Sequence, residues 1–252
     1  MIFAVMVQFI VCFLIMKWVL KQKPDGKFST GSVVAFFVAG AIATIPDLAL
    51  AIGFDLDGET FKDLNPYLGG FLTAFLLAAV MEEVLKYIAF RLVIRKNKEV
   101  NCWLDAIIAA IVVGIGFALF EDVTYGMFGD GNIMRAILPV HILFQLLMGY
   151  FYGKARVTKQ FGDHVLSLAV PILCHTVYDM FALSIKVLLA NEDMEALRAL
   201  SQEEIMKLPF INDAMVMAVG MFVTTVGTLV AMIIMLKKLG EWSKNGEKQE
   251  LI

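Results

Sequence analysis

Residues 81–87 read Met-Glu-Glu-Val-Leu-Lys-Tyr and lie inside an apolar run that begins near Tyr67 and ends near Ile94. A run of this length predicts a helix that crosses a membrane. An ionised carboxylate near the bilayer centre costs roughly 2.5 to 3.5 kcal/mol on insertion scales, so Glu82 and Glu83 cannot both face lipid. The stretch therefore predicts a helix bundle with a polar interior, and the two glutamates mark its functional site.

Lys86 is the nearest partner for these acids, because it follows Glu82 by four residues and Glu83 by three. Side chains at either spacing share one face of a helix, so a single ammonium can reach either carboxylate while the other stays able to titrate. The alternative is an ion pair that only locks this helix to its neighbour. The second glutamate is a surplus acid that such a pair does not explain.

The composition places the whole chain in a membrane. Hydrophobic residues make up 60% of its 252 residues, whereas soluble domains contain roughly 45 to 50%. Membrane spans of about 20 residues would use most of this length, so we expect one integral membrane domain over residues 1–252. The net charge of -3 offers no basic surface for nucleic acid. The expected surroundings are the lipids of the cell membrane.

Seven apolar runs predict an all-α, multi-pass helix bundle. The runs cover residues 2–20, 32–54, 67–93, 103–124, 133–153, 165–190 and 211–236. The connections after runs 1, 3 and 5 and the C-terminal tail, counted with Lys17 and Arg91 near the ends of runs 1 and 3, hold fifteen basic residues. The connections after runs 2, 4 and 6, counted with Arg135 near the start of run 5, hold four. By the positive-inside rule the N-terminus lies outside, residues 191–210 form an extracytoplasmic loop, and residues 237–252 form a cytoplasmic tail.

Three local signals refine this topology. No basic residue precedes the first run and Lys17 lies at its inner end, which predicts an uncleaved first span. Pro46 in the second run predicts a helix break, with the carboxylate of Asp47 accepting from a freed backbone donor. Ser201 and Glu204 have capping-box spacing, which predicts a short helix within the loop of residues 191–210.

Polar residues at helical spacing also lie in the later runs. Glu121 and Tyr125 are four residues apart, His141 lies alone in the fifth run, and His175 and Asp179 are again four apart. An acid near the membrane surface can simply be solvated, and a lone intramembrane histidine is most often a hydrogen-bond partner between helices. The carboxylate of Asp179, however, can accept the proton of one His175 ring nitrogen and present the other nitrogen to a metal or a substrate.

Depth relates these residues to the glutamates. At about 1.5 Å per residue from the inner end of each span, Glu82, His141 and His175 lie roughly 15 to 20 Å above the inner surface, and Glu121 lies somewhat higher. Two histidines and several carboxylates at one level suit a zinc ion with an open coordination position. They suit equally a metal-free acid/base site that activates water.

The order of these motifs on successive helices resembles the PrsW family of intramembrane proteases. The motifs are Glu82-Glu83-x-x-Lys86, Phe120-Glu121-x-x-x-Tyr125, His141 and His175-x-x-x-Asp179, within a core of residues 67–190. They are also similar to the wider superfamily of CAAX prenyl endopeptidases and bacteriocin-processing proteins (CPBP), whose pattern is E-E-x-x-x-R, F-x-x-x-H and H-x-x-x-N/D. Lys86 lies one residue before the arginine position of that pattern and Tyr125 one residue after its histidine position, which favours the PrsW branch and argues against prenylated substrates.

The resemblance implies an intramembrane endopeptidase whose site lies on the third to sixth helices. Glu82 and Glu83 would be the core acids, and Glu82 would be the general base for water. His141 and His175 would polarise the scissile carbonyl or bind a metal, for which Zn²⁺ is the candidate. The family further implies a single-span membrane protein as substrate, such as an anti-sigma factor that receives its first (site-1) cut in a stress response.

The resemblance also implies supporting roles. Lys86 would hold the geometry of the acid pair, and Asp179 would orient His175. Glu121 would be a third metal ligand beside the histidines or an acid that supports one of them, with Tyr125 beside it on the same helix face.

Other functions fit the same residue types. A proton-coupled transporter or channel also buries acids and histidines, although no internal repeat relates the two halves of the chain, as many transporter folds would require. A non-catalytic scaffold of the same fold is a second alternative. A haem bound by His141 and His175 is a third, and the neighbouring glutamates argue against it.

Overall fold

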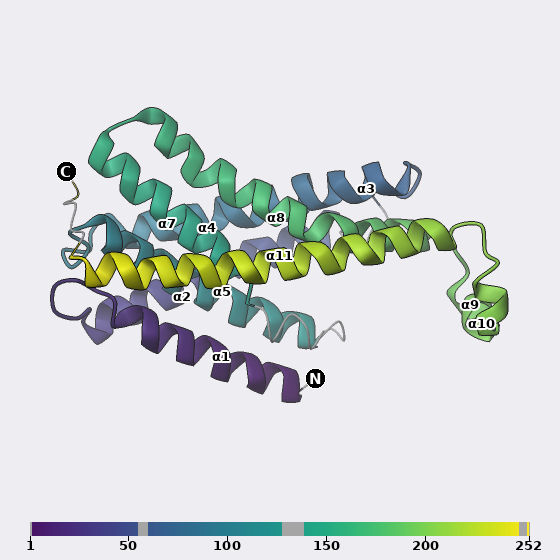
Figure 1. The fold of residues 1–252 in the computed structure, drawn as a ribbon, viewed down its shortest axis with the longest axis horizontal. Helices are drawn as coiled ribbons and strands as arrows, with labels where there is room; N and C mark the ends of the chain where they lie inside the picture. The colour runs from purple at the N-terminus through teal and green to yellow at the C-terminus, as the bar shows by residue number, and fades with distance from the viewer. Residues whose placement is uncertain (1, 55–59, 128–138, 247–250, 252) are drawn as a thin grey trace. The chain divides into compact units, whose positions relative to one another are not determined.

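The computed structural model describes residues 2–54, 60–127, 139–246 and 251, and its regular elements over these ranges are helices (Figure 1). The predicted all-α class is therefore confirmed. In chain order the elements are α1 (Ile2–Leu20), α2 (Thr30–Phe54), α3 (Pro66–Leu72), the π-helix η1 (Thr73–Ala79), α4 (Val80–Ile94), α5 (Trp103–Met127), α7 (His141–Thr158), α8 (Phe161–Ala190), α9 (Met194–Ala199), α10 (Gln202–Ile205) and α11 (Ile211–Lys244).

Within the described ranges, five helical stretches are long and apolar enough to cross a membrane. They are Thr30–Ala49, Pro66–Ile94, Trp103–Thr124, Phe161–Ala190 and Ile211–Lys244, and a shorter apolar helix covers Met6–Leu20. These lengths, together with the composition, describe a multi-pass membrane protein. The number of seven spans stays a prediction.

The fifth predicted run is where the helix boundaries differ most from expectation. Residues 133–138 of this run lie outside the described residues, and α7 begins at His141 with Val140 as its N-cap residue. Pro139 has no N–H to donate and restricts the residue before it, which favours a helix start at this point. Its carbonyl accepts the N–H of Ile142 at 3.0 Å. His141 is thus the first residue of its helix instead of lying about eight residues inside it.

Helix α2 corrects a second expectation, since it continues through Pro46 to Phe54. The predicted break at this proline is wrong. A proline removes one backbone hydrogen bond, and membrane helices tolerate the loss where Ser or Thr side chains and neighbouring helices satisfy the backbone.

The described chain forms two compact units. One contains Met1–Leu48, Glu82–Pro171 and Thr228–Ile252, and the other contains Ala49–Met81 and Ile172–Gly227. We call them unit 1 and unit 2. The single domain expected over residues 1–252 stays a prediction.

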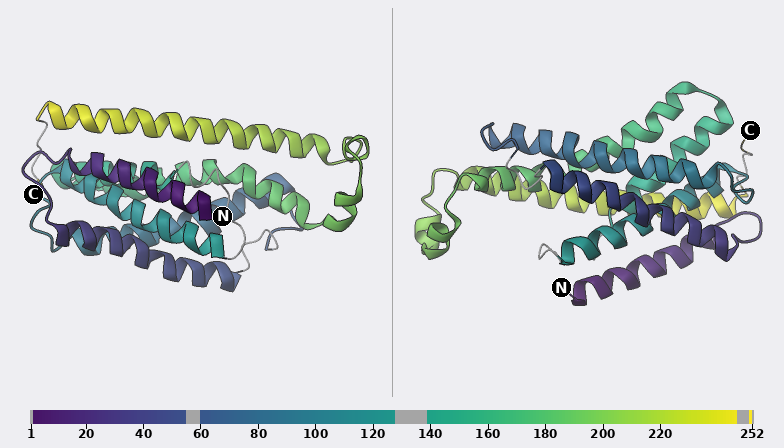
Figure 2. Two further views of the ribbon diagram at one scale, coloured as in Figure 1. Left: turned by 90° about the horizontal axis from the view of Figure 1, so that it is seen from below. Right: turned by 180° about the vertical axis from the view of Figure 1, so that it is seen from behind.

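Helix α5 is the core of unit 1. Its residues are buried almost throughout the apolar stretch, and it packs against α7 and α1 (Figure 2). Helix α2 approaches it so closely that a Cβ on Gly40 would lie 1.9 Å from the carbonyl oxygen of Val113, and one on Gly116 would lie 2.0 Å from that of Phe37. Such contacts are possible only for glycine, as is common where membrane helices meet. This packing fixes the backbone on which the polar side chains of unit 1 are placed.

Unit 2 contains the connection of residues 191–210 and its capping motif. A Cβ on Gly70 of α3 would lie 2.2 Å from the hydroxyl of Ser184 on α8, so these two helices are in close contact. The capping box predicted for Ser201 and Glu204 is confirmed at the start of α10. Hydrogen bonds from the side chain and the backbone N–H of Ser201 lower the pKa of the Glu204 carboxyl.

Candidate active site

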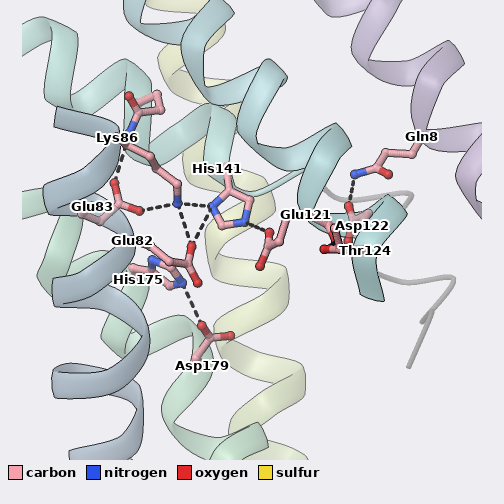
Figure 3. Close-up of polar contacts among 11 residues, drawn as sticks. Gln8, Glu82, Glu83, Lys86, Glu121, Asp122, Thr124, His141, His175 and Asp179 are labelled. Atoms are coloured by element: carbon pink, nitrogen blue, oxygen red, sulfur yellow. Dashed lines mark hydrogen bonds and ion pairs between the residues drawn. The ribbon is translucent and has the colours of Figure 1, made fainter. Parts of the chain in front are cut away.

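Three charged side chains of α4 are buried together in unit 1. The ammonium of Lys86 donates to Oε2 of Glu82 at 2.8 Å and to Oε1 of Glu83 at 2.9 Å (Figure 3). The expectation that Lys86 could reach either acid is confirmed, and it binds both at once. The acids differ in access, because the side chain of Glu82 keeps 8% of its surface exposed and that of Glu83 keeps 0%.

Lys86 also meets groups from two other helices. Its Nζ lies 2.9 Å from Nδ1 of His141 on α7 and 3.8 Å from the ring centre of Phe117 on α5. An ammonium has only donors, so Nδ1 must accept and carries no proton. The aromatic face adds a cation–π contact that is strongest where water is excluded. Lys86 therefore holds helices α4, α5 and α7 together around one charge.

The tautomer of His141 follows from this contact. With Nδ1 accepting from Lys86, the proton sits on Nε2, which lies 2.7 Å from Oε2 of the buried Glu121 (Figure 3). A carboxylate that accepts one imidazole proton fixes the ring and raises the basicity of the opposite nitrogen, as it does behind many metal-binding histidines. Glu121 on α5 thus orients His141, and its bonded oxygen faces the ring.

Gln145 is a buried residue of this cluster to which the sequence analysis assigned no role. It lies one turn after His141 on α7, and its Nε2 donates to Oε2 of Glu83 at 3.1 Å. Both oxygens of Glu83 are therefore hydrogen-bonded, one to Lys86 and one to Gln145. The available signal was a four-residue spacing from His141, which places both side chains on one helix face.

Within unit 1, three of these side chains offer ligand atoms for a metal. Glu82, Glu83 and His141 can each contribute one oxygen or nitrogen, and these atoms lie within 4.8 Å of one another. Carboxylate oxygens with an imidazole nitrogen are a donor set that suits Zn²⁺. The side chains present therefore fit a divalent metal.

Unit 2 contains the predicted pair of a histidine and an aspartate on one helix, His175 and Asp179. Nε2 of the buried His175 lies 2.8 Å from Oδ2 of Asp179, one turn later on α8 (Figure 3). The predicted pairing of these residues is confirmed. With Nε2 donating its proton to the carboxylate, Nδ1 is the nitrogen that carries a lone pair.

Tyr125 lies on α5, and its side chain is outside the described residues.

Comparison with known proteins decides the family. Residues 29–200 match the family model of the PrsW family intramembrane metalloproteases. The chain belongs to the PrsW family. It is 32% identical to Protease PrsW of Halalkalibacterium halodurans over 165 residues, which cover 63% of this chain and 73% of the relative. It is 30% identical to Protease PrsW of Oceanobacillus iheyensis over 154 residues, which cover 58% of this chain and 68% of the relative.

Membership of the PrsW family confirms the interpretation as a membrane-embedded peptidase, an intramembrane protease. Protease PrsW of Geobacillus kaustophilus is also similar, at 34% identity over 118 residues. No solved structure matches the chain. The matched PrsW region, residues 29–200, includes each of the motifs quoted above.

Proposed function

We propose that Glu82, Glu83, His141 and His175 carry out the proteolysis, and that the substrate is a single-span membrane protein such as an anti-sigma factor, cut at site 1. The observation that best supports the site is the buried pair of carboxylates held by one ammonium. A pair of this kind is costly in a membrane and is typical of functional sites. The motif order supports a relationship to the CPBP superfamily as well, with Lys86 as this chain's variation.

Glu82 is the general base in this proposal. It retains more exposure than Glu83, so water reaches it more readily. Its carboxylate accepts a proton from water as the water oxygen bonds to the scissile carbonyl carbon, and it returns that proton to the amine that leaves. Lys86 keeps the carboxylate in place through this cycle.

Glu83 and His141 would hold the metal, and His175 is proposed as a further ligand from its motif position and its pairing with Asp179. A bound Zn²⁺ supplies Lewis-acid polarisation of the carbonyl and lowers the pKa of water. Glu121 orients the His141 ring, because its carboxylate accepts the Nε2 proton. In this proposal it is not a third metal ligand. Lys86 has to leave Nδ1 of His141 before this nitrogen can bind a cation.

Metal content is a direct test of this donor set. We expect purified, active protein to contain about one equivalent of zinc, to lose activity on chelation, and to regain it when zinc is restored. Elemental analysis beside an activity assay provides the measurement. Full activity with less than about a tenth of an equivalent of any transition metal would contradict the metal assignment and leave Glu82 and the histidines as a metal-free site.

The proposed orientation has the N-terminus outside and the C-terminus in the cytoplasm, and it rests on the distribution of basic residues. In this orientation α7 runs inward from His141, so His141 lies at the outer end of its helix. Reporter fusions at Asp193 and Lys244 test the orientation, and a cytoplasmic signal from Asp193 would contradict it.

Because His141 lies at the outer end of α7 in this orientation, we expect the site to open outward and the substrate to be cut near the outer membrane surface. An extended segment can reach a buried site only through a polar cavity, because lipid leaves its amides unsatisfied. The product that keeps the cytoplasmic domain should therefore retain most of its transmembrane helix. Co-expression with candidate single-span proteins from the same genome, followed by mass spectrometry, identifies the fragment. The Glu82→Ala variant is the control and should yield none, and a new terminus in the cytoplasmic half of the substrate's span would contradict the proposal.

A further inference from the structure

Gln145 makes one hydrogen bond in the site and leaves its other polar atom unsatisfied. Its Nε2 donates to Oε2 of Glu83 at 3.1 Å, and the residue is fully buried. Its Oε1 is also buried and has no hydrogen-bond partner among the residues that the structure describes. The reverse amide orientation would set Oε1 against the carboxylate oxygen of Glu83, where both atoms are acceptors, so the orientation is fixed by its partner.

A side chain that only fills space in the core is not expected to carry a buried amide oxygen without a hydrogen-bond partner. A buried amide oxygen without a partner destabilises a fold relative to an apolar side chain of similar shape. Leucine at position 145 would fill much of the same space and remove the unsatisfied acceptor. Leucine would, however, leave Oε2 of the buried Glu83 without this amide donor, so the chemistry at position 145 is explained by Glu83 and not by packing.

The neighbouring helix accommodates this side chain at a further cost. Gly114 lies in the middle of α5, where glycine is a poor helix former. A Cβ on Gly114 would lie 2.5 Å from Cγ of Gln145 and 2.8 Å from its Cβ. A Cβ at this position would also lie 3.1 Å from the carbonyl oxygen of His141, so Gly114 leaves the space that α7 and the Gln145 side chain occupy beside α5.

We propose that Gln145 is a positioning residue that fixes the second oxygen of Glu83 while Lys86 fixes the first. With both oxygens held, the carboxylate cannot rotate out of its working orientation. Residues that orient ligands and catalytic acids in this way typically contribute about 10- to 100-fold to activity or metal affinity. This inference rests on the proposed role of Glu83 in catalysis.

The test is Gln145→Leu in the full chain, assayed in detergent or lipid vesicles. We expect kcat to fall by about 10- to 100-fold with KM changed by less than about twofold. The melting temperature does not decide between the roles, because the substitution removes one unsatisfied acceptor and at the same time takes a donor from the buried Glu83. A purely structural role predicts that the folded fraction keeps its full kcat, and that result would overturn the inference.

Gln8 provides a matched control. It is buried on α1, donates from Nε2 to Oδ2 of Asp122, and its Oε1 likewise has no partner among the described residues. Gln8→Leu makes the same chemical change away from Glu83 and should leave kcat unchanged. An equal fall in kcat for Gln8→Leu and Gln145→Leu would overturn the inference.

Gly114→Ala tests the same hydrogen bond from the other helix. The added methyl group would displace Cβ and Cγ of Gln145 and approach the carbonyl oxygen of His141, so we expect a similar loss of kcat. Glu83→Gln separates the two proposals. If Glu83→Gln is inactive and Gln145→Leu keeps full kcat, only the role of Gln145 fails. If Glu83→Gln keeps full activity, the proposed role of Glu83 fails and the inference fails with it.

Discussion

Replacing Glu82 with glutamine is expected to lower kcat for substrate cleavage by about 10²- to 10⁴-fold, the range that general acid/base catalysis contributes. An amide cannot take the proton from water, yet it has nearly the shape of the carboxylate. Its oxygen still accepts from Lys86, which also keeps its bond to Glu83. The variant should therefore stay folded. Cleavage of a single-span substrate in vesicles, with the melting temperature measured on the same preparation, provides the test.

Glu203→Gln is a suitable control for Glu82→Gln, because Glu203 makes the same type of bond to a lysine four residues away but is exposed. It should keep full activity. If Glu82→Gln unfolds instead of becoming inactive, the glutamates serve mainly as a structural ion pair. If it stays folded and active, another residue is the general base.

Replacing Lys86 with methionine is expected to lower the free energy of unfolding by about 3 to 5 kcal/mol, the usual effect of removing one partner from a buried ion pair. Methionine has a similar length, so most of the loss comes from charge. Glu82 and Glu83 would be left buried without their shared cation, and the contact with Phe117 would lose its cation–π component. Denaturant unfolding in detergent micelles at neutral pH gives this free energy.

Lys207→Met is the matched control for this charge. Lys207 pairs with Glu203 at 2.6 Å across the same four-residue spacing, but the two side chains are 69% and 81% exposed. Exposed pairs are worth about 0 to 1 kcal/mol, so the control should be close to wild type. Equal losses in both variants would show that burial of the charges does not explain the effect at Lys86.

Contacts within one helix could be predicted from the sequence. The bonds from Lys86 to Glu82 and Glu83 and the pairing of His175 with Asp179 follow from helical spacing, because side chains three or four residues apart share a face. The helical class follows in the same way from long apolar runs. These features need no knowledge of how the helices pack.

Contacts between helices could not be predicted in this way. The bonds of His141 to Lys86 and Glu121 join α4, α5 and α7, and they depend on the close approach of the α5 and α7 backbones. The role of Gln145 depends on the absence of a side chain at Gly114. Depth along a span places such residues at one level but does not say which of them meet.

Local departures of the backbone from a regular α-helix account for the remaining differences between the predicted and the observed helices. Pro46 did not end α2, while Pro139 marks the start of α7, so the same residue type had opposite outcomes. The π-helix η1 over Thr73–Ala79 directly precedes α4. A π-turn takes an extra residue, so the face periodicity of an α-helix does not carry across it. An apolar sequence gives no signal for this change.

The pairing of Lys86 with two acids on its own helix also bears on how the chain enters the bilayer. Helix α4 is synthesised before α7, so His141 is not yet available when α4 leaves the ribosome. Because the three charges are neighbours on one face of α4, they can neutralise one another without help from another helix. The insertion machinery then meets a segment with one uncompensated charge instead of three, at roughly 2.5 to 3.5 kcal/mol for each charge. Lys86 thereby makes it easier for the helix that carries the acids to become a membrane span at all.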